Sequence, residues 1–159
     1  MMNITLITVG KLKEKYLTLA QSEYLKRLSR FSKVEIVEIQ DEKIPDNASG
    51  SEKDKILKKE GEKILSHIKD NSPVVAMCIE GDLVSSEDLA KKVDSFQMQS
   101  GKMYFIIGGS LGLSSEVKNR ANVKISFGRI TLPHQLIRVV LLEQIYRSFK
   151  IINNETYHK

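Results

Sequence analysis

The chain has 159 residues, of which 41% are hydrophobic and 28% are charged, and its formal net charge is +5. These values are ordinary for a soluble globular protein, so we expect residues 1–159 to form a single domain with a substantial core. One cysteine excludes an intrachain disulfide, no window reaches the ~18 unbroken apolar residues of a membrane span, and the N-terminus lacks a basic signal-peptide segment, so we expect a cytoplasmic protein.

Strand and helix periods alternate along the whole chain. The first half predicts strands at 3–10, 33–39 and 73–79, amphipathic helices at 11–31 and 52–69, and a polar loop at 40–51. The second half predicts a helix capped by Ser85, a strand at 102–107, a short helix at 114–122, a strand at 123–127 and a long helix at 133–152. This alternation predicts an α/β architecture, a mostly parallel sheet flanked by helices on both faces.

The long helix at 133–152 is apolar over far more than the ~100° stripe of a surface helix. Its apolar residues are Leu136, Ile137, Val139, Val140, Leu141, Leu142, Ile145, Tyr146 and Phe149. Such a helix must be buried on more than one side. A subunit interface explains this pattern, and so does a central helix of the monomer core.

Positive charge gathers near the two ends of the chain. Residues 11–33 carry a net charge of +5 and residues 124–159 carry +4, whereas the segment between them carries −4. If the fold brings the ends together, they form a basic face suited to nucleic acid. The residues expected on or beside that face are Lys11, Lys13, Lys15, Arg129, Arg138 and Lys159. Two solvated helix faces without a partner are the alternative.

A glycine-rich stretch, IIGGSLGL at residues 106–113, ends the strand at 102–107. It lacks the G-x-x-x-x-G-K-[ST] pattern of a P-loop and the G-x-G-x-x-G pattern of a Rossmann turn. The residues alone leave two interpretations, a tight strand-to-helix turn without a ligand and a ligand site of another kind.

Few side chains offer catalytic chemistry. The histidines, His67, His134 and His158, show no metal-ligand spacing, and Cys78 lies within a predicted strand. No set of nucleophile, histidine and acid can be assigned. An enzyme with this sequence would therefore need neither a metal nor a covalent nucleophile, and group transfer from a reactive cosubstrate fits that restriction.

Several motifs along the chain form a specific combination. They are ITVGKLKEKY at 7–16, GGSLGL at 108–113, SF at 126–127, TLPHQ at 131–135, RV at 138–139, EQ at 143–144, YR at 146–147 and YHK at 157–159. Together they resemble the RlmH family, small bacterial methyltransferases of the SPOUT class that act on 23S ribosomal RNA. The resemblance covers essentially the whole chain.

The resemblance implies a SPOUT fold, an α/β domain with a deep C-terminal trefoil knot, a topology that sequence periodicity cannot show. It implies a homodimer that uses S-adenosyl-L-methionine as cosubstrate, and no metal, to methylate N3 of a pseudouridine. The implied substrate is 23S rRNA within the ribosome, with no role for DNA or a membrane.

The resemblance also implies a cosubstrate site built from three segments. The matching residues are Met77, Gly108, Phe127, Gly128, Arg129, Ile130, Thr131 and Leu132. Family members often have leucine where this chain has Met77, a flexible side chain of similar volume. Glycine-rich backbone can read an adenine edge while an apolar wall holds the ring.

The implied catalytic residues are His158, Arg138 and Tyr157. The pseudouridine N3–H must lose its proton, which His158 could accept, or a cationic group could stabilise the developing anion. Arg138 and the tail at 157–159 are candidates for holding the nucleotide, and Tyr157 could stack on a base. A frayed terminus is the alternative for the tail.

Two functions from other classes stay open at this point. One is a non-enzymatic RNA-binding protein associated with the ribosome, and the other is a flavodoxin-like nucleotide-binding domain without an RNA role. Binding of S-adenosyl-L-methionine separates the methyltransferase from both.

Overall fold

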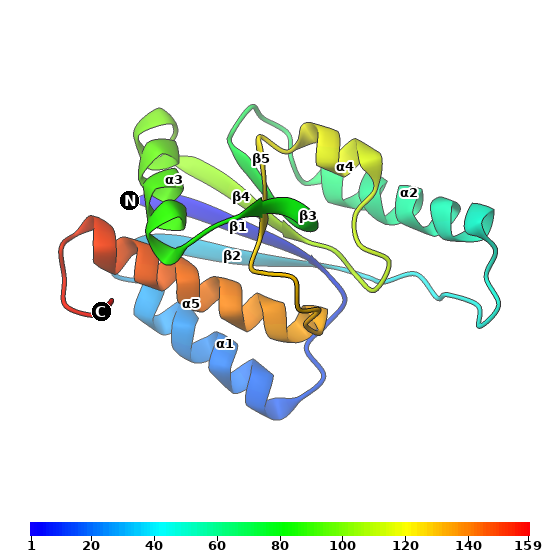
Figure 1. Cartoon of the computed structure of the whole chain (residues 1–159), viewed down its shortest axis with the longest axis horizontal. Helices are drawn as coiled ribbons and strands as arrows, with labels where there is room; N and C mark the ends of the chain where they lie inside the picture. The colour runs from blue at the N-terminus through cyan, green and yellow to red at the C-terminus, as the bar shows by residue number, and fades with distance from the viewer.

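Five parallel strands form one sheet in the computed structural model, which describes all 159 residues (Figure 1). The strands are β1 (Met2–Val9), β2 (Ser32–Ile39), β3 (Val74–Leu83), β4 (Lys102–Ile107) and β5 (Val123–Ser126), arranged in the order β2-β1-β4-β3-β5. The helices are α1 (Lys15–Leu28), α2 (Gly50–Ser66), α3 (Ser86–Gln99), α4 (Ser115–Arg120) and α5 (His134–Ile152). The predicted α/β class with a parallel sheet flanked by helices is confirmed.

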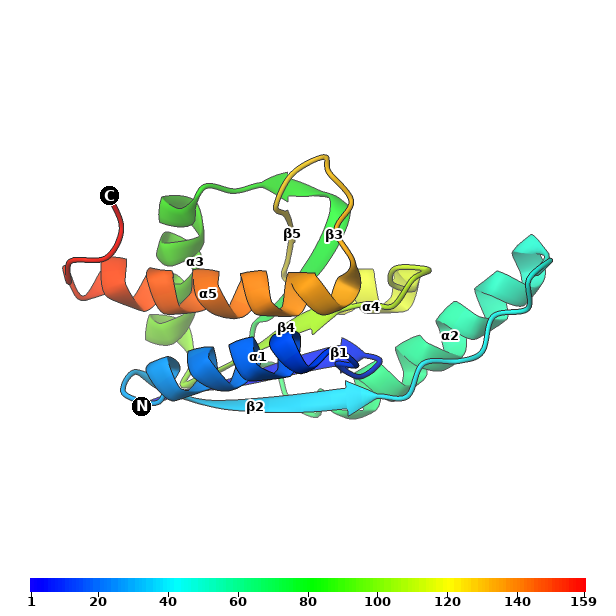
Figure 2. The same cartoon turned by 90° about the horizontal axis from the view of Figure 1, so that it is seen from below.

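Helices α1, α3 and α5 cover one face of the sheet, and α2 and α4 cover the other (Figure 2). Alternating residues of each strand supply the two cores, because successive side chains point to opposite faces. In β4, Met103 and Phe105 pack on the α5 side, whereas Tyr104 and Ile106 pack on the α2 side. Burial on both faces explains why the inner strands β1 and β4 and the first part of β3 read as largely apolar runs, whereas the edge strand β2 does not.

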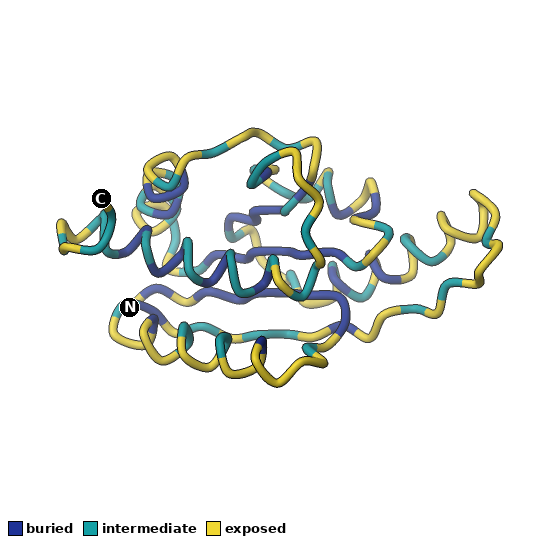
Figure 3. The backbone as a smooth tube through the Cα atoms, turned by 60° about the horizontal axis from the view of Figure 1, so that its bottom comes forward, coloured by how far each residue is buried: buried dark blue, intermediate teal, exposed yellow.

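Helix α5 lies in the middle of its layer, between α1 and α3, and packs against both (Figure 1). Leu141, Leu142 and Ile145 are fully buried within the chain, and Figure 3 shows α5 almost entirely in the buried and intermediate colours. The central-helix explanation of its wide apolar surface is therefore confirmed for these residues, and Leu141 offers nothing to a second subunit. No helix, α5 included, is both long and apolar enough to cross a membrane.

The carboxyl ends of all five strands lie at one edge of the sheet, because the strands run in the same direction. The loops that leave this edge include residues 108–114 after β4 and residues 127–133 after β5. Ligands of open α/β sheets bind at this edge. The fold therefore gathers the glycine-rich stretch and the segment before α5 where a ligand site is expected.

Strand β3 continues to residue 83, beyond the predicted end at 79, through a bulge. Met77 and Asp82 both pair with Ile125 of β5, so the four residues between them leave the ladder. Gly81 makes this possible, since a Cβ there would lie 2.7 Å from the Ile125 backbone. The bulge lies at the carboxyl edge and shapes the end of β3.

Candidate functional site

Residues 108–112, here called the glycine turn, fold tightly against themselves. The N–H of Gly112 donates to the carbonyl oxygen of Gly109 at 3.0 Å. A Cβ on Gly108 would overlap the carbonyl of Gly112 and lie 2.9 Å from the Leu113 side chain. Gly108 is therefore required by the turn itself, before any ligand is considered.

The β5–α5 loop, residues 127–132, leaves much of its backbone free. The Ser126 hydroxyl donates to the Gly128 carbonyl at 3.0 Å and accepts from the Gly128 N–H at 3.2 Å. From Arg129 to Leu132, no backbone N–H or C=O takes part in a hydrogen bond within the chain. Gly128 has a φ of 137°, which L side chains rarely adopt, and its missing Cβ faces open space. This loop can offer donors and acceptors to a planar heterocycle.

The three segments predicted to bind the cosubstrate converge at the carboxyl edge of neighbouring strands. Met77 of β3 pairs with Ile125 of β5, and the preceding residue pairs with Ile106 of β4, which puts Met77 near the level of Gly108. Met77 and Phe127 are half-buried and pack against the core on the α5 side. An apolar wall, a tight glycine turn and a loop with unpaired backbone groups thus meet, which fits a ligand with an adenine ring.

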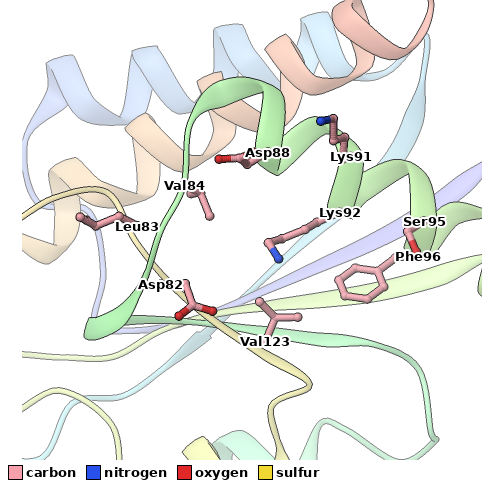
Figure 4. Close-up of a pocket in the computed structure, with 9 residues that line it drawn as sticks. All are labelled: Asp82, Leu83, Val84, Asp88, Lys91, Lys92, Ser95, Phe96 and Val123. Atoms are coloured by element: carbon pink, nitrogen blue, oxygen red, sulfur yellow. The ribbon is translucent and has the colours of Figure 1, made fainter.

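A separate groove of about 480 Å³ lies between α3 and the ends of β3 and β5 (Figure 4). It is lined by Asp82, Leu83, Val84, Asp88, Lys91, Lys92, Ser95, Phe96 and Val123. Lys92 and Asp82 project into it from opposite walls (Figure 4). None of the predicted cosubstrate residues lines this groove, and its charges are mixed, so it is distinct from the convergence of the three segments.

Tyr157 and His158 of the tail, residues 157–159, fold back onto α5 and α3, so these two residues are not a frayed end. The Tyr157 hydroxyl donates to Glu143 at 3.1 Å, and its ring lies edge-on to Tyr146 with centroids 5.0 Å apart. The Arg147 guanidinium lies 4.6 Å from the Tyr157 ring centroid and is paired with Glu143 at 2.6 Å. Burial, followed by the bond to Glu143, raises the pKa of the Tyr157 hydroxyl.

His158 sits between an anion and a cation. Its Nε2 lies 2.6 Å from the Glu87 carboxylate at the start of α3, and its Nδ1 lies 3.2 Å from Arg147. The hydrogen bond to His158 lowers the pKa of Glu87, so Glu87 is ionised at neutral pH. The tail residues Tyr157 and His158 are therefore ordered by side chains of two helices.

The tail and the β5–α5 loop lie at opposite ends of α5 in the same chain (Figures 1 and 2). The helix has 19 residues, which at 1.5 Å per residue is about 28 Å. Because the tail folds back, Tyr157 is held at Glu143 and His158 at Arg147, which lie about 14 and 20 Å along α5 from its first residue. Neither tail residue forms a hydrogen bond with a predicted cosubstrate residue of the same chain.

Arg138 is placed differently from the sequence expectation, because its side chain is only 1% exposed. It donates to Glu38 at 2.7 Å and to the carbonyl of Gly10 at 3.0 Å, and its buried Nε has no partner. The prediction that Arg138 lies on an exposed basic face is wrong, because the guanidinium ties β1, β2 and α5 together. A contact of Arg138 with the nucleotide stays a prediction.

The other predicted cations are exposed but divided between two places. Lys11, Lys13 and Lys15 precede or begin α1, next to the start of α5, where the Lys13 N–H donates to Gln135 at 3.0 Å. Arg129 is exposed in the adjoining β5–α5 loop. Lys159 lies with the tail at the far end of α5, away from Lys11, Lys13 and Lys15. The two basic chain segments do pack side by side as α1 and α5, and Arg30, just after α1, pairs with Glu155.

Sequence reasoning gave no role to Glu60, a carboxyl that is only 5% exposed at the carboxyl edge. Its Oε2 accepts the Glu42 backbone N–H at 3.0 Å, and its Oε1 would lie 3.9 Å from a Cβ on Gly109. Burial raises the pKa of the Glu60 carboxyl. The sequence does not indicate that Glu60 is buried on the inner face of α2, because a glutamate in a helix with many charged residues is expected to face solvent.

Glu87, Glu143 and Arg147 were also not predicted as site residues. Glu143 and Arg147 are spaced i, i+4 on α5, a pattern that predicts an ion pair but not its contact with the tail. The contact of Glu87 with His158 joins residues 71 positions apart, and no local pattern indicates it. No group of three or more His, Cys, Asp or Glu side chains is placed to hold a metal ion.

Comparison with known proteins gives matches over the full length. A family model described as "Predicted SPOUT methyltransferase" matches residues 2–158. The ribosomal RNA large subunit methyltransferase H of Clostridium novyi is 57% identical over 99% of this chain and all of that protein. The protein of the same name from Oenococcus oeni is 55% identical, with both chains fully covered.

One solved structure shares the fold at much lower identity. The tRNA (m1G37) methyltransferase of Aquifex aeolicus has a TM-score of 0.53 and 15% identity, covering 91% of this chain and 69% of that one. At this identity the likeness concerns the arrangement of strands and helices alone.

Proposed function

The chain belongs to the SPOUT methyltransferase family, and we propose that it transfers the methyl group of S-adenosyl-L-methionine to N3 of a pseudouridine in 23S rRNA. The observation that carries this proposal is the end-to-end match to relatives named ribosomal RNA large subunit methyltransferase H. We propose that the substrate is the rRNA within the ribosome, so the protein acts in the cytoplasm and on neither DNA nor membranes.

The proposed cosubstrate site is the convergence of Met77, Gly108 and the β5–α5 loop. The free N–H and C=O groups of residues 129–132 suit the edge of an adenine, and Met77 with Phe127 suits its face. The backbone at Gly128 is open on the side where a side chain would stand. These features support binding of a nucleoside-containing ligand against the backbone of the β5–α5 loop.

The proposed chemistry is an in-line methyl transfer in which the chain mainly aligns the reactants. S-adenosyl-L-methionine supplies an activated methyl group on a sulfonium. The N3 proton of the pseudouridine goes to His158, the N3 electron pair forms the new bond to carbon, and the pair of the broken carbon–sulfur bond returns to sulfur. Tyr157 presents an aromatic face for the base, and Arg138 supports the start of α5 beside the cosubstrate loop.

We propose a homodimer in which the tail of one subunit completes the site of the other. Its support is that the tail is held at Glu143 and Arg147, about 14–20 Å along α5 from the end that carries the β5–α5 loop, and forms no hydrogen bond with that loop in the same chain. A two-fold axis across the middle of α5 would set the two helices antiparallel and bring each tail beside the partner's loop. Exposed apolar side chains near this end support a covered surface: Tyr16, Leu19, Ile130 and Leu136.

The trefoil knot is part of the same proposal. β5 lies at the sheet edge beyond β3, and α5 then returns across the sheet to pack between α3 and α1. Such a return path supports a chain that threads the β3–α3 segment, as the family resemblance implies.

The test combines cosubstrate titration with methyl transfer to ribosomes. Calorimetry should show binding of S-adenosyl-L-methionine, and purified protein should methylate ribosomes from a strain that lacks the gene. Mass spectrometry of 23S rRNA from that strain should show one pseudouridine without its methyl group. Binding to ribosomes without binding of the cosubstrate would instead favour the non-enzymatic RNA-binding alternative.

A further inference from the structure

Both ring nitrogens of His158 are engaged, and their partners differ in kind. Nδ1 faces the Arg147 guanidinium at 3.2 Å, and Nε2 faces the Glu87 carboxylate at 2.6 Å. A guanidinium only donates hydrogen bonds, so Nδ1 must accept. An ionised carboxylate only accepts, so Nε2 must carry the hydrogen. The contacts therefore select the neutral tautomer with its proton on Nε2.

We propose that Glu87 is a positioning residue for the methyl transfer, which holds the His158 ring by its Nε2–H so that Nδ1 is the atom that takes the substrate proton. This inference rests on the proposed function, because it assigns a role within the same reaction. In this role Glu87 acts through His158 and needs no contact of its own with the reacting atoms.

The carboxylate of Glu87 is held in place by the start of α3. Ser85 and Asp88 form a reciprocal capping box, with hydrogen bonds of 3.0 Å in each direction. The Ser86 hydroxyl donates to Gln144 of α5 at 2.7 Å, which ties this turn to the helix that carries the tail. Glu87 therefore stands on a fixed turn, and the ring that it holds inherits that position.

Arg147 donates a hydrogen bond to Nδ1 of His158 when no substrate is bound, but the position of its guanidinium is fixed by other contacts. Its Nε and Nη2 are bonded to Glu143 at 3.0 and 2.6 Å, so only the remaining nitrogen faces His158. When a uracil ring arrives, this nitrogen can turn to a base carbonyl and leave Nδ1 free to accept the N3 proton. The resulting imidazolium would then face Glu87, an anion, through its other nitrogen.

A double-mutant cycle tests the proposal with methyl transfer to ribosomes as the readout. We expect Glu87→Ala to lower kcat about tenfold, a part of the 10²–10⁴ that proton transfer contributes, with KM for ribosomes and cosubstrate affinity within about twofold. In a His158→Ala background, Glu87→Ala should have no further effect, because its route to the reaction is gone. Asp94→Ala is the matched control, since it removes a carboxylate from the same helix that forms no ion pair or side-chain hydrogen bond.

Nitrogen NMR of the His158 ring supplies a readout that is independent of catalysis. The wild-type protein should show a protonated, hydrogen-bonded Nε2 and a bare Nδ1, and Glu87→Ala should lose the hydrogen-bond shift at Nε2 while Glu87→Gln keeps part of it. Equal losses of kcat from Glu87→Ala in both backgrounds, or unchanged kcat, would overturn the proposal. A wild-type protein without any methyl transfer would defeat the proposed function instead, and the NMR result would still decide whether Glu87 sets the tautomer.

Discussion

Replacing Gly108 by alanine should damage cosubstrate binding through the protein's own backbone. The added Cβ would overlap the Gly112 carbonyl and come within 2.9 Å of the Leu113 side chain. Leu113 can rotate away, but the carbonyl belongs to the turn and can move only if the turn opens. The ligand surface of the glycine turn then shifts even though the new methyl group never meets the ligand.

The loss of folding stability depends on the fact that a backbone carbonyl, that of Gly112, must move to admit the new Cβ. Overpacking against fixed neighbours costs about 1–3 kcal/mol, and for a chain of this size each kcal/mol lowers Tm by about 2–4 °C. We therefore expect Gly108→Ala to lower Tm by about 2–12 °C. Because the opened turn is displaced from the ligand, affinity for S-adenosyl-L-methionine should fall at least about tenfold.

Gly101→Ala is the matched control, since no atom lies within 4 Å of its Cβ position and the residue is far from the glycine turn. Thermal melts and calorimetric titrations of the wild type and both variants make the comparison. A wild-type Tm for Gly108→Ala would refute the steric reasoning. A lowered Tm with wild-type affinity would instead remove the glycine turn from the cosubstrate site.

Three further predictions follow from exposure, contacts and charge. Leu19 is 60% exposed on α1, and Leu19→Asp should give a folded monomer by light scattering that binds the cosubstrate but does not methylate rRNA. Leu141→Asp should instead unfold the chain, because it buries a charge. A Leu19→Asp dimer with full activity would contradict the proposed interface. Deleting residues 157–159 should leave cosubstrate affinity within about twofold and abolish methyl transfer, and retained activity would return the tail to a structural role. Burial raises the pKa of Glu60 above its ordinary 4.5, so the folded state binds the proton of this carboxyl more tightly than the unfolded state. The ionised carboxylate therefore destabilises the folded protein, and this loss of stability grows as pH rises. Urea unfolding should accordingly show Glu60→Gln gaining stability relative to the wild type between pH 4 and pH 8, and a constant difference would contradict this account.

Local periodicity was sufficient to predict the elements and their class. Alternating apolar residues define the strands, and the capping serine at residue 85 is in the place that the sequence predicts. The prediction missed what depends on contacts between distant segments. α1 begins at Lys15 rather than at residue 11 because the chain first turns beside α5, and β3 runs on through a bulge that needs the backbone of β5 opposite Gly81.

The candidate site divides in the same way. The cosubstrate segments came from contiguous motifs matched by resemblance, and the fold brings Met77, Gly108 and the β5–α5 loop to one edge. The contacts that individual side chains make in the fold could not be predicted from the motifs. Arg138 is expected from charge and resemblance to be an exposed cation, yet the carboxylate of Glu38 and the carbonyl of Gly10, both far away in sequence, hold it inside.

The geometry of α5 supports the proposal that two copies of the chain work as a pair. The helix is fixed by the sheet below it and by α1 and α3 on either side, so it cannot bend to bring its two ends together. One end carries the proposed cosubstrate loop, and the ordered tail is held at Glu143 and Arg147, about 14–20 Å along the helix from that end. A longer protein could add a domain to reach the RNA base. In the proposed dimer, the tail of the second copy would supply the aromatic ring of Tyr157 and the imidazole of His158 for this purpose. In that dimer, a two-fold axis would bring the tail of one subunit, proposed to position the base, to the proposed cosubstrate loop of the other.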